Sequence, residues 1–222
     1  MYNLDETIVA RRSVRGFLPH RPVPRHVLVE ALELAQHAPS NCNVQPWRVF
    51  IASGARRDRL RAALVEAAAG GQMPSPEDVP DTFPEPYKRL QVDCAIALYE
   101  EMGVDRYDKL GRQRAFLRNY ELFDAPHVAI VCMEKSFGVG VALDVGMYVQ
   151  TLMLALWARG VRSCPQASLR IYPQIVRREL EIPENLRILC GVSFGYEDES
   201  VPANRTRQTR QAIDRNVFFR DE

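Results

Sequence analysis

The sequence predicts one domain that combines several helices with a few strands. Residues 48–52, 127–133 and 186–196 have the β-branched or continuously apolar composition of strands. Apolar side chains recur at helical spacing in residues 27–38. Residues 141–158 are apolar nearly all round and predict a helix that must be buried, in the domain centre or at a subunit interface. Because 46% of the 222 residues are hydrophobic, the chain can build one substantial core.

The helices are predicted from apolar periodicity and from residues that start or stop a helix. Asn3 and Glu6 have the spacing of a capping box, which predicts a short first helix that ends near Arg11. Pro39 ends the helix of residues 27–38, because a residue before proline is pushed out of the α-helical region. Further helices are expected at residues 55–69, 87–102, 110–122 and 173–180.

The remaining segments predict a lid and an arm on a single domain of residues 1–222. Residues 72–86 contain five prolines, which excludes regular structure there and places a variable lid at 72–123. The C-terminal arm spans 202–222, and its apolar segment 217–219 should dock on a partner subunit. Four aromatic residues of the lid are expected to pack rather than to touch a substrate: Tyr107, Phe116, Tyr120 and Phe123.

Composition excludes several classes of function. A formal net charge of +1 argues against a nucleic-acid partner and against a membrane surface. The five cysteines are widely spaced and form no C-x-x-C pair, so neither a disulfide framework nor a metal site is predicted. The N-terminus has no apolar core of signal-peptide length, and no uncharged run is long enough to span a bilayer. We therefore expect a soluble cytoplasmic protein.

A glycine-rich turn at Gly138 and Gly140 does not indicate a dinucleotide-binding fold. That fingerprint needs a third glycine at the position that Leu143 occupies. A Rossmann phosphate loop is therefore excluded here.

Residues 38–47 form a polar junction between a predicted helix and a predicted strand. Ser40, Asn41, Asn43 and Gln45 supply hydrogen-bond donors and acceptors that could read the edge of a planar ligand. Taken alone, such a cluster is also typical of an ordinary polar loop.

A second polar cluster lies near the N-terminus. Arg11, Arg12, Ser13 and Arg15 place three guanidinium groups and a hydroxyl within five residues, which could bind a phosphate. By itself, such a cluster is more often a solvated charged face.

Four stretches resemble the motifs of the FMN-dependent nitroreductase family. Residues 38–47 resemble its A-P-S-x-x-N-x-Q-P-W signature, and residues 11–17 resemble R-R-S-x-R-x-F. Residues 160–166 resemble G-x-x-x-C-P-Q, and residues 204–210 resemble N-x-x-R-x-x-R. The resemblance implies an α+β fold with a mixed or antiparallel central sheet flanked by helices. It also implies an intertwined homodimer that binds FMN at the subunit interface.

The resemblance assigns cofactor-binding roles and no catalytic side chain. It places Arg11, with Ser13, at the flavin phosphate, and Arg15 beside the pyrimidine end, where its charge would tune the flavin. The backbone of residues 165–167 would approach the reactive edge of the ring, and Asn204 would add to the phosphate contacts. The full set of implied cofactor-binding residues is Arg11, Arg12, Ser13, Arg15, Ser40, Asn41, Asn43, Gln45, Asn119, Pro165, Gln166, Ala167, Arg207 and Arg210. Arg205 could compete with the last two.

The implied function is electron transfer from NADH or NADPH to a nitroaromatic, quinone or similar planar acceptor by a ping-pong mechanism. The alternatives are a reductive dehalogenase or another specialised FMN enzyme of the superfamily, and a flavin-binding protein without turnover. The chain departs from the family at Glu197, where many relatives have proline, and it matches weakly between residues 72 and 121.

Overall fold

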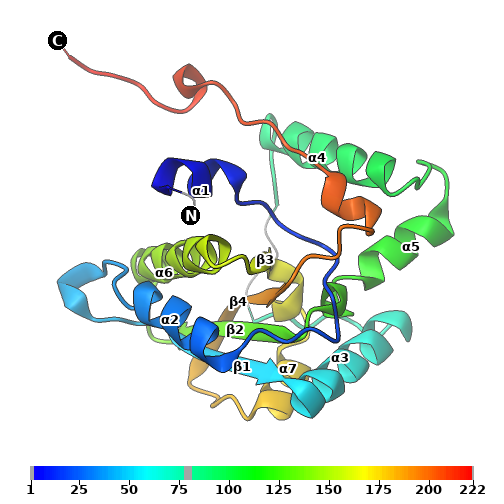
Figure 1. Ribbon diagram of the computed structural model, residues 1–222, viewed down its shortest axis with the longest axis horizontal. Coiled ribbons are helices and arrows are strands. Elements are labelled where there is room, and N and C mark those ends of the chain that lie inside the picture. Colours follow the sequence, from blue (N-terminus) through cyan, green and yellow to red (C-terminus); the bar gives the residue numbers. More distant parts are fainter. Residues whose placement is uncertain (1–2, 78–81, 222) are drawn as a thin grey trace.

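The computed structural model describes residues 3–77 and 82–221 and has the expected α+β architecture (Figure 1). The helices are α1 (Leu4–Ala10), α2 (Arg25–Ala35), α3 (Gly54–Ala69), α4 (Tyr87–Glu101), α5 (Lys109–Leu117), α6 (Val139–Ala158) and α7 (Pro173–Leu180). The strands are β1 (Arg48–Ser53), β2 (His127–Glu134), β3 (Arg162–Gln166) and β4 (Leu186–Gly195). The capping box predicted at Asn3 and Glu6 is present at the start of α1.

The four strands form an antiparallel sheet in the order β1-β2-β4-β3. β2 lies at the centre, and its residues His127–Met133 are buried, as the continuous apolar run predicts. Helices α2 and α6 contribute to the hydrophobic cluster on one face of the sheet, and α3 and α7 to the cluster on the other. β3 is an edge strand of the described sheet, and this places its backbone within reach of the N-terminal segment.

The lid region differs from the prediction at the end of its second helix. α5 ends at Leu117 rather than at Leu122. Leu122, Phe123 and Asp124 have left-handed backbone angles, which exclude an α-helix through these residues. No residue of α4 is buried, so this helix packs on the surface of the domain and is not part of its core. The predicted irregular segment 72–86 contains no helix or strand in its described part, and residues 78–81 lie outside the described residues.

The prediction that the four lid aromatics pack is right for three of them. Tyr120 and Phe123 are buried, and the half-exposed Phe116 packs edge-on against Tyr120 with ring centroids 5.4 Å apart. Tyr107 is 83% exposed, so the prediction is wrong for this residue within one subunit.

Helix α6 carries one buried and one open apolar face. Its length and composition are those of a membrane-spanning helix, but its buried face packs against α2 and the sheet as part of the core. On the open face, Val139, Leu143 and Met147 are exposed, Leu143 by 68%. The prediction that this helix must be buried is therefore met on one side only within a single subunit.

The buried His127 at the start of β2 makes hydrogen bonds that depend on its protonation state. The Val23 backbone N–H donates to His127 Nε2 at 2.8 Å, and His127 Nδ1 lies 2.5 Å from Ser53 Oγ. Because Nε2 accepts, the ring is neutral and Nδ1 donates to the serine. Burial, with the nearby Arg57 charge, lowers the pKa of His127 to about 4. Protonation would therefore break the bond to Val23.

We expect the free energy of unfolding to fall as pH drops from about 6.5 to about 4. The folded pKa of His127 lies below the unfolded value, so its stabilisation is complete above pH 6.5 and is lost through this window. The loss is about 3 kcal/mol at pH 4. Urea unfolding of wild type and His127→Gln from pH 7.5 to 4 measures the difference. Parallel profiles of the two proteins would contradict the assignment.

Candidate functional site

The N-terminal strap, residues 11–17, is extended and lies along the free edge of β3. The Val14 N–H donates to the Ser163 carbonyl at 3.1 Å, and the two serines Ser13 and Ser163 form a parallel bridge. Val14 is buried, and a Cβ on Gly16 would lie 2.6 Å from Val201. Successive side chains of an extended segment point in opposite directions. We therefore infer that Arg11, Ser13 and Arg15 lie on the side of the strap away from Val14 and Gly16, whereas Phe17 at the end of the strap is buried in the same cluster as Val14.

Arg11 and Arg210 form an uncompensated pair of cations. Burial and the charge of Arg210 lower the pKa of Arg11, because both disfavour its charged form. In the described part of the chain, the Arg11 guanidinium has no acidic partner. The Ser13 hydroxyl lies beside the Cys164 thiol, and together with the nearby Arg15 and Arg11 charges it opposes the rise in the pKa of that thiol. Two cations without an anion make this end of the strap a site for a negatively charged group.

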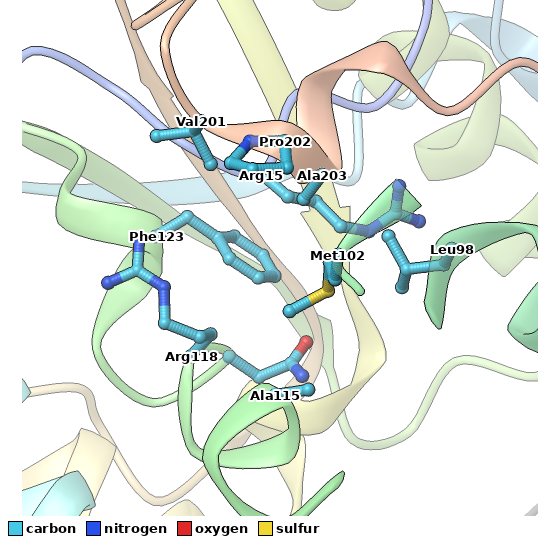
Figure 2. Close-up of a pocket in the computed structure, with 10 residues that line it drawn as sticks. Arg15, Leu98, Met102, Ala115, Arg118, Phe123, Val201, Pro202 and Ala203 are labelled. Carbon is cyan, nitrogen blue, oxygen red and sulfur yellow. The ribbon is translucent and has the colours of Figure 1, made fainter. Parts of the chain in front are cut away.

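Arg15 reaches into a cavity of about 150 Å³ between the lid and the arm (Figure 2). Its walls are mostly apolar: Leu98 of α4, Ala115 of α5, Met102, Phe123, Val201, Pro202 and Ala203, with Arg118 and Asn119 as polar members. Arg118 is neutralised by Glu121 and Asp124, each at 2.7 Å. Among the described residues, the Arg15 side chain has no such partner, so its charge is available to a ligand.

The backbone of residues 165–167, at the end of β3, is held in place by the Gln166 side chain. The Gln166 side chain is buried, accepts a hydrogen bond from Ser193 Oγ at 2.5 Å and donates to the Asn119 carbonyl at 2.8 Å. Pro165 and Ala167 on either side are exposed. The Gln166 side chain therefore positions the 165–167 backbone and does not face a ligand. Its neighbour Cys164 is buried, which raises the pKa of the thiol to about 11, so Cys164 is inert as predicted.

The arm contributes less to an anion site than its sequence pattern suggests. Asn204 is buried, and its side chain bonds the Arg15 N–H at 2.7 Å, the Gly16 carbonyl at 2.9 Å and the Asp198 carbonyl at 2.8 Å. The prediction that Asn204 binds phosphate is therefore wrong, because its hydrogen-bonding groups hold the strap. Arg205 pairs with Glu101 of α4 at 3.1 Å. Among the described residues, the side chains of Arg207 and Arg210 bond backbone carbonyls of the arm itself.

The polar junction is a tight loop with donors and acceptors on its surface. Asn43 and Gln45 have left-handed backbone angles, and the Gln45 N–H donates to Ser40 Oγ at 3.0 Å. The Asn41 N–H donates to Asp144 on α6 at 3.1 Å, which anchors the loop. Trp47 stacks on Tyr148 with ring centroids 4.8 Å apart, so it fills the core. The side chains of Asn41 and Asn43 remain exposed.

The structure separates the predicted site residues into two groups. The polar junction is fixed near the start of α6 through Asp144, whereas the strap docks on β3, which follows the end of α6 (Figure 1). A helix of 20 residues is about 30 Å long. One copy of the chain therefore carries two half-sites at opposite ends of α6.

Two contacts of the site were not predicted from the sequence. Arg12 is not directed with Arg11, because its guanidinium pairs with Glu197 at 2.5 Å. Asp144, an acidic residue inside the apolar helix α6, holds the polar junction. An acidic residue inside an apolar run could have indicated that Asp144 has a polar partner. No pattern in the neighbouring residues links Arg12 to Glu197.

Comparisons with known proteins identify the family of the chain and similar folds. The profile of the nitroreductase family matches residues 8–196. The chain is 38% identical over 218 residues to nitroreductase NfnB of Mycolicibacterium smegmatis, covering 97% of this chain and 92% of the relative. It is 35% identical to a 4-nitrobenzoate reductase of Nocardioides sp., covering 97% and 89%. The crystal structure of the FMN-dependent NfnB from Mycobacterium smegmatis in complex with NADPH superposes with a TM-score of 0.92, covering 97% of both chains.

Proposed function

Because the chain belongs to the nitroreductase family, we propose that it uses FMN to pass electrons from NADH or NADPH to a nitroaromatic, quinone or similar planar acceptor. When bound, FMN supplies the redox chemistry by accepting a hydride and releasing electrons to the second substrate. The relatives named above reduce nitro compounds and one of them was crystallised with NADPH, which favours these substrate classes.

The observation that carries the proposal is the uncompensated charge of Arg11 beside Arg210. A phosphate monoester there would neutralise two cations and accept hydrogen bonds from the Arg11 guanidinium and the Ser13 hydroxyl. Arg207 lies on the same arm and would add a further donor. The residues present therefore fit the phosphate end of FMN. Arg12, which pairs with Glu197, would take no direct part.

The other end of the cofactor would lie between Arg15 and the edge of β3. The Arg15 charge would face the pyrimidine end of the flavin and favour its anionic reduced form. The 165–167 backbone, held by Gln166, would approach the reactive edge of the ring, with Asn119 nearby. The apolar cavity between α4, α5 and the arm would shield the ring from water (Figure 2).

A homodimer would unite the two half-sites. An isologous interface places the same surface of both copies around a two-fold axis. If the open faces of two α6 helices pack antiparallel, the start of one lies beside the end of the other. The polar junction of one copy, with Ser40, Asn41, Asn43 and Gln45, would then meet the strap of its partner. The groove on this face contains Ala142, which has only a methyl side chain, and Gly146, which has none, so a second helix can approach closely.

The exposed arm also suits a dimer. Phe218 and Phe219 are 66% and 73% exposed, and the arm extends away from the body (Figure 1). Docking these rings on a second copy would bury them. The five cysteines are all free, as suits a reducing compartment, so the protein would work in the cytoplasm.

Purified protein should be yellow and should release one FMN per subunit into the supernatant on acid precipitation. Anaerobic mixing with NADH or NADPH should bleach the flavin rapidly, and 4-nitrobenzoate or a quinone should restore the colour. A bound flavin that neither donor reduces would support the binding protein without turnover. Reoxidation by a halogenated phenol but not by nitroaromatics would support the dehalogenase. Recovery of FAD, or of no flavin after incubation with FMN, would overturn the proposal.

A further inference from the structure

Glu197 and Arg12 form a shielded ion pair behind the strap. Arg12 Nη2 lies 2.5 Å from Glu197 Oε1, and the two side chains are only 24% and 13% exposed. The Arg12 guanidinium carbon also lies 5.5 Å from the ring centroid of buried Trp157, and that of Arg162 lies 3.9 Å from the same ring. Arg162 Nε approaches the second oxygen of Glu197 at 3.9 Å. One carboxylate therefore faces two guanidinium groups that share a tryptophan.

The residues on either side of Glu197 are hydrogen-bonded through their backbones to Gly16 and Leu18, at the end of the strap. The Leu18 N–H donates to the Tyr196 carbonyl at 2.9 Å, and the Asp198 N–H donates to the Gly16 carbonyl at 3.0 Å. Backbone pairing fixes the strap to β3 from the Ser13–Ser163 bridge onward, and to the chain around Glu197 from Gly16 onward. Ahead of that bridge, the Arg12 side chain ties the strap to Glu197.

The sequence itself leaves the direction of the first strap residues ambiguous. Arg11 and Arg12 are adjacent and chemically identical, and neighbours in an extended segment point to opposite sides. A slip by one residue would bring Arg12 to the phosphate side and turn Arg11 and Ser13 away. The Arg12–Glu197 ion pair acts with the Ser13–Ser163 bridge to remove this ambiguity, because an arginine held by Glu197 cannot also turn towards the phosphate.

We infer that Glu197 is a positioning residue that selects Arg11, rather than Arg12, as the phosphate-binding arginine by holding Arg12 on the opposite side of the strap. The inference rests on the proposed function. Glu197 touches neither the cofactor nor the substrates and acts through Arg12 on the placement of Arg11 and Ser13.

Glu197→Gln tests the inference by removing the charge and keeping the shape. Arg12 would then compete for the phosphate, and the dissociation constant of FMN should rise about tenfold. The turnover number at saturating FMN should stay near the wild-type value. The matched control is Glu199→Gln, which makes the same change at an exposed acid two residues further on and should leave FMN affinity unchanged. Unchanged affinity in Glu197→Gln, with FMN bound normally by wild type, would overturn the inference.

The double variant Arg12→Gln/Glu197→Gln separates positioning from a general structural role. With no second arginine left to compete, FMN affinity should return to within about threefold of wild type. A double variant that binds FMN as weakly as Glu197→Gln, or more weakly, would overturn the inference. If Glu197→Gln does not fold, Arg12→Gln alone decides: near-normal affinity supports the selection of Arg11, and a tenfold loss overturns it. If wild type binds no FMN at all, the proposed function fails instead.

Discussion

Arg11→Ala should bind FMN about 10 to 150 times more weakly than wild type, and its turnover should recover once FMN is saturating. The substitution removes a charged hydrogen bond of about 1.5 to 3 kcal/mol, which corresponds to this range of affinity. Arg11 is the half-buried cation that faces Arg210 without an acidic partner among the described residues, so a bound phosphate is the group that would compensate it. Fluorescence titration of the flavin-free variant measures the affinity.

Arg15→Ala is the matched control, because it removes the same side chain four residues further along the strap. Arg15 lines the cavity and would stabilise the reduced flavin more than the oxidised one. Without Arg15, the reduced flavin should lose about 1 to 2 kcal/mol of stabilisation relative to the oxidised flavin. This loss should lower the midpoint potential by roughly 20 to 45 mV. Saturating FMN should not repair this defect. Equal potentials in wild type and both variants would show that Arg15 does not face the ring.

The elements that could be predicted from the sequence are those whose start, end or burial is set by residues within the element or next to it. The capping box at Asn3 and Glu6 starts α1, and the glycine pair after Ala69 ends α3. The buried run of β2 reads as a central strand because both of its faces are covered. The end of α5 could not be predicted, because apolar side chains at Tyr120 and Leu122 continue the helical period while the backbone has already turned.

The candidate site was harder to predict because its parts are joined by distant contacts. Asn204 matches a ligand-like pattern, yet its amide holds the strap 189 residues away. Arg12 repeats Arg11 in sequence but differs in role, since its partner Glu197 lies 185 residues further on. The polar junction and the strap belong to one motif set and still lie at opposite ends of α6. The motif resemblance implies a site at a subunit interface, but the motif residues alone do not show which of them each copy would contribute.

Because the two half-sites lie at opposite ends of α6, FMN binding should depend on a dimer that packs through the open face of this helix. Leu143→Arg should therefore yield a monomer that retains no FMN. Leu143 is 68% exposed in one copy and lines an apolar groove with Val139 and Met147. Burying an unpaired guanidinium there costs several kcal/mol, and two-fold symmetry applies the cost twice. A total of about 5 kcal/mol weakens dimerisation by roughly 10³ to 10⁴.

Loss of FMN should accompany loss of the dimer, because the strap of one copy would no longer meet the polar junction of the other. Leu143→Met keeps the apolar volume at the same position and should remain dimeric and yellow. Light scattering coupled to absorbance detection reports mass and flavin content in one experiment. A stable monomer of Leu143→Arg with normal FMN content would show that one copy forms the whole site. An unaffected dimer would place the interface elsewhere, because a charge at Leu143 can be tolerated only if that face of α6 remains in water.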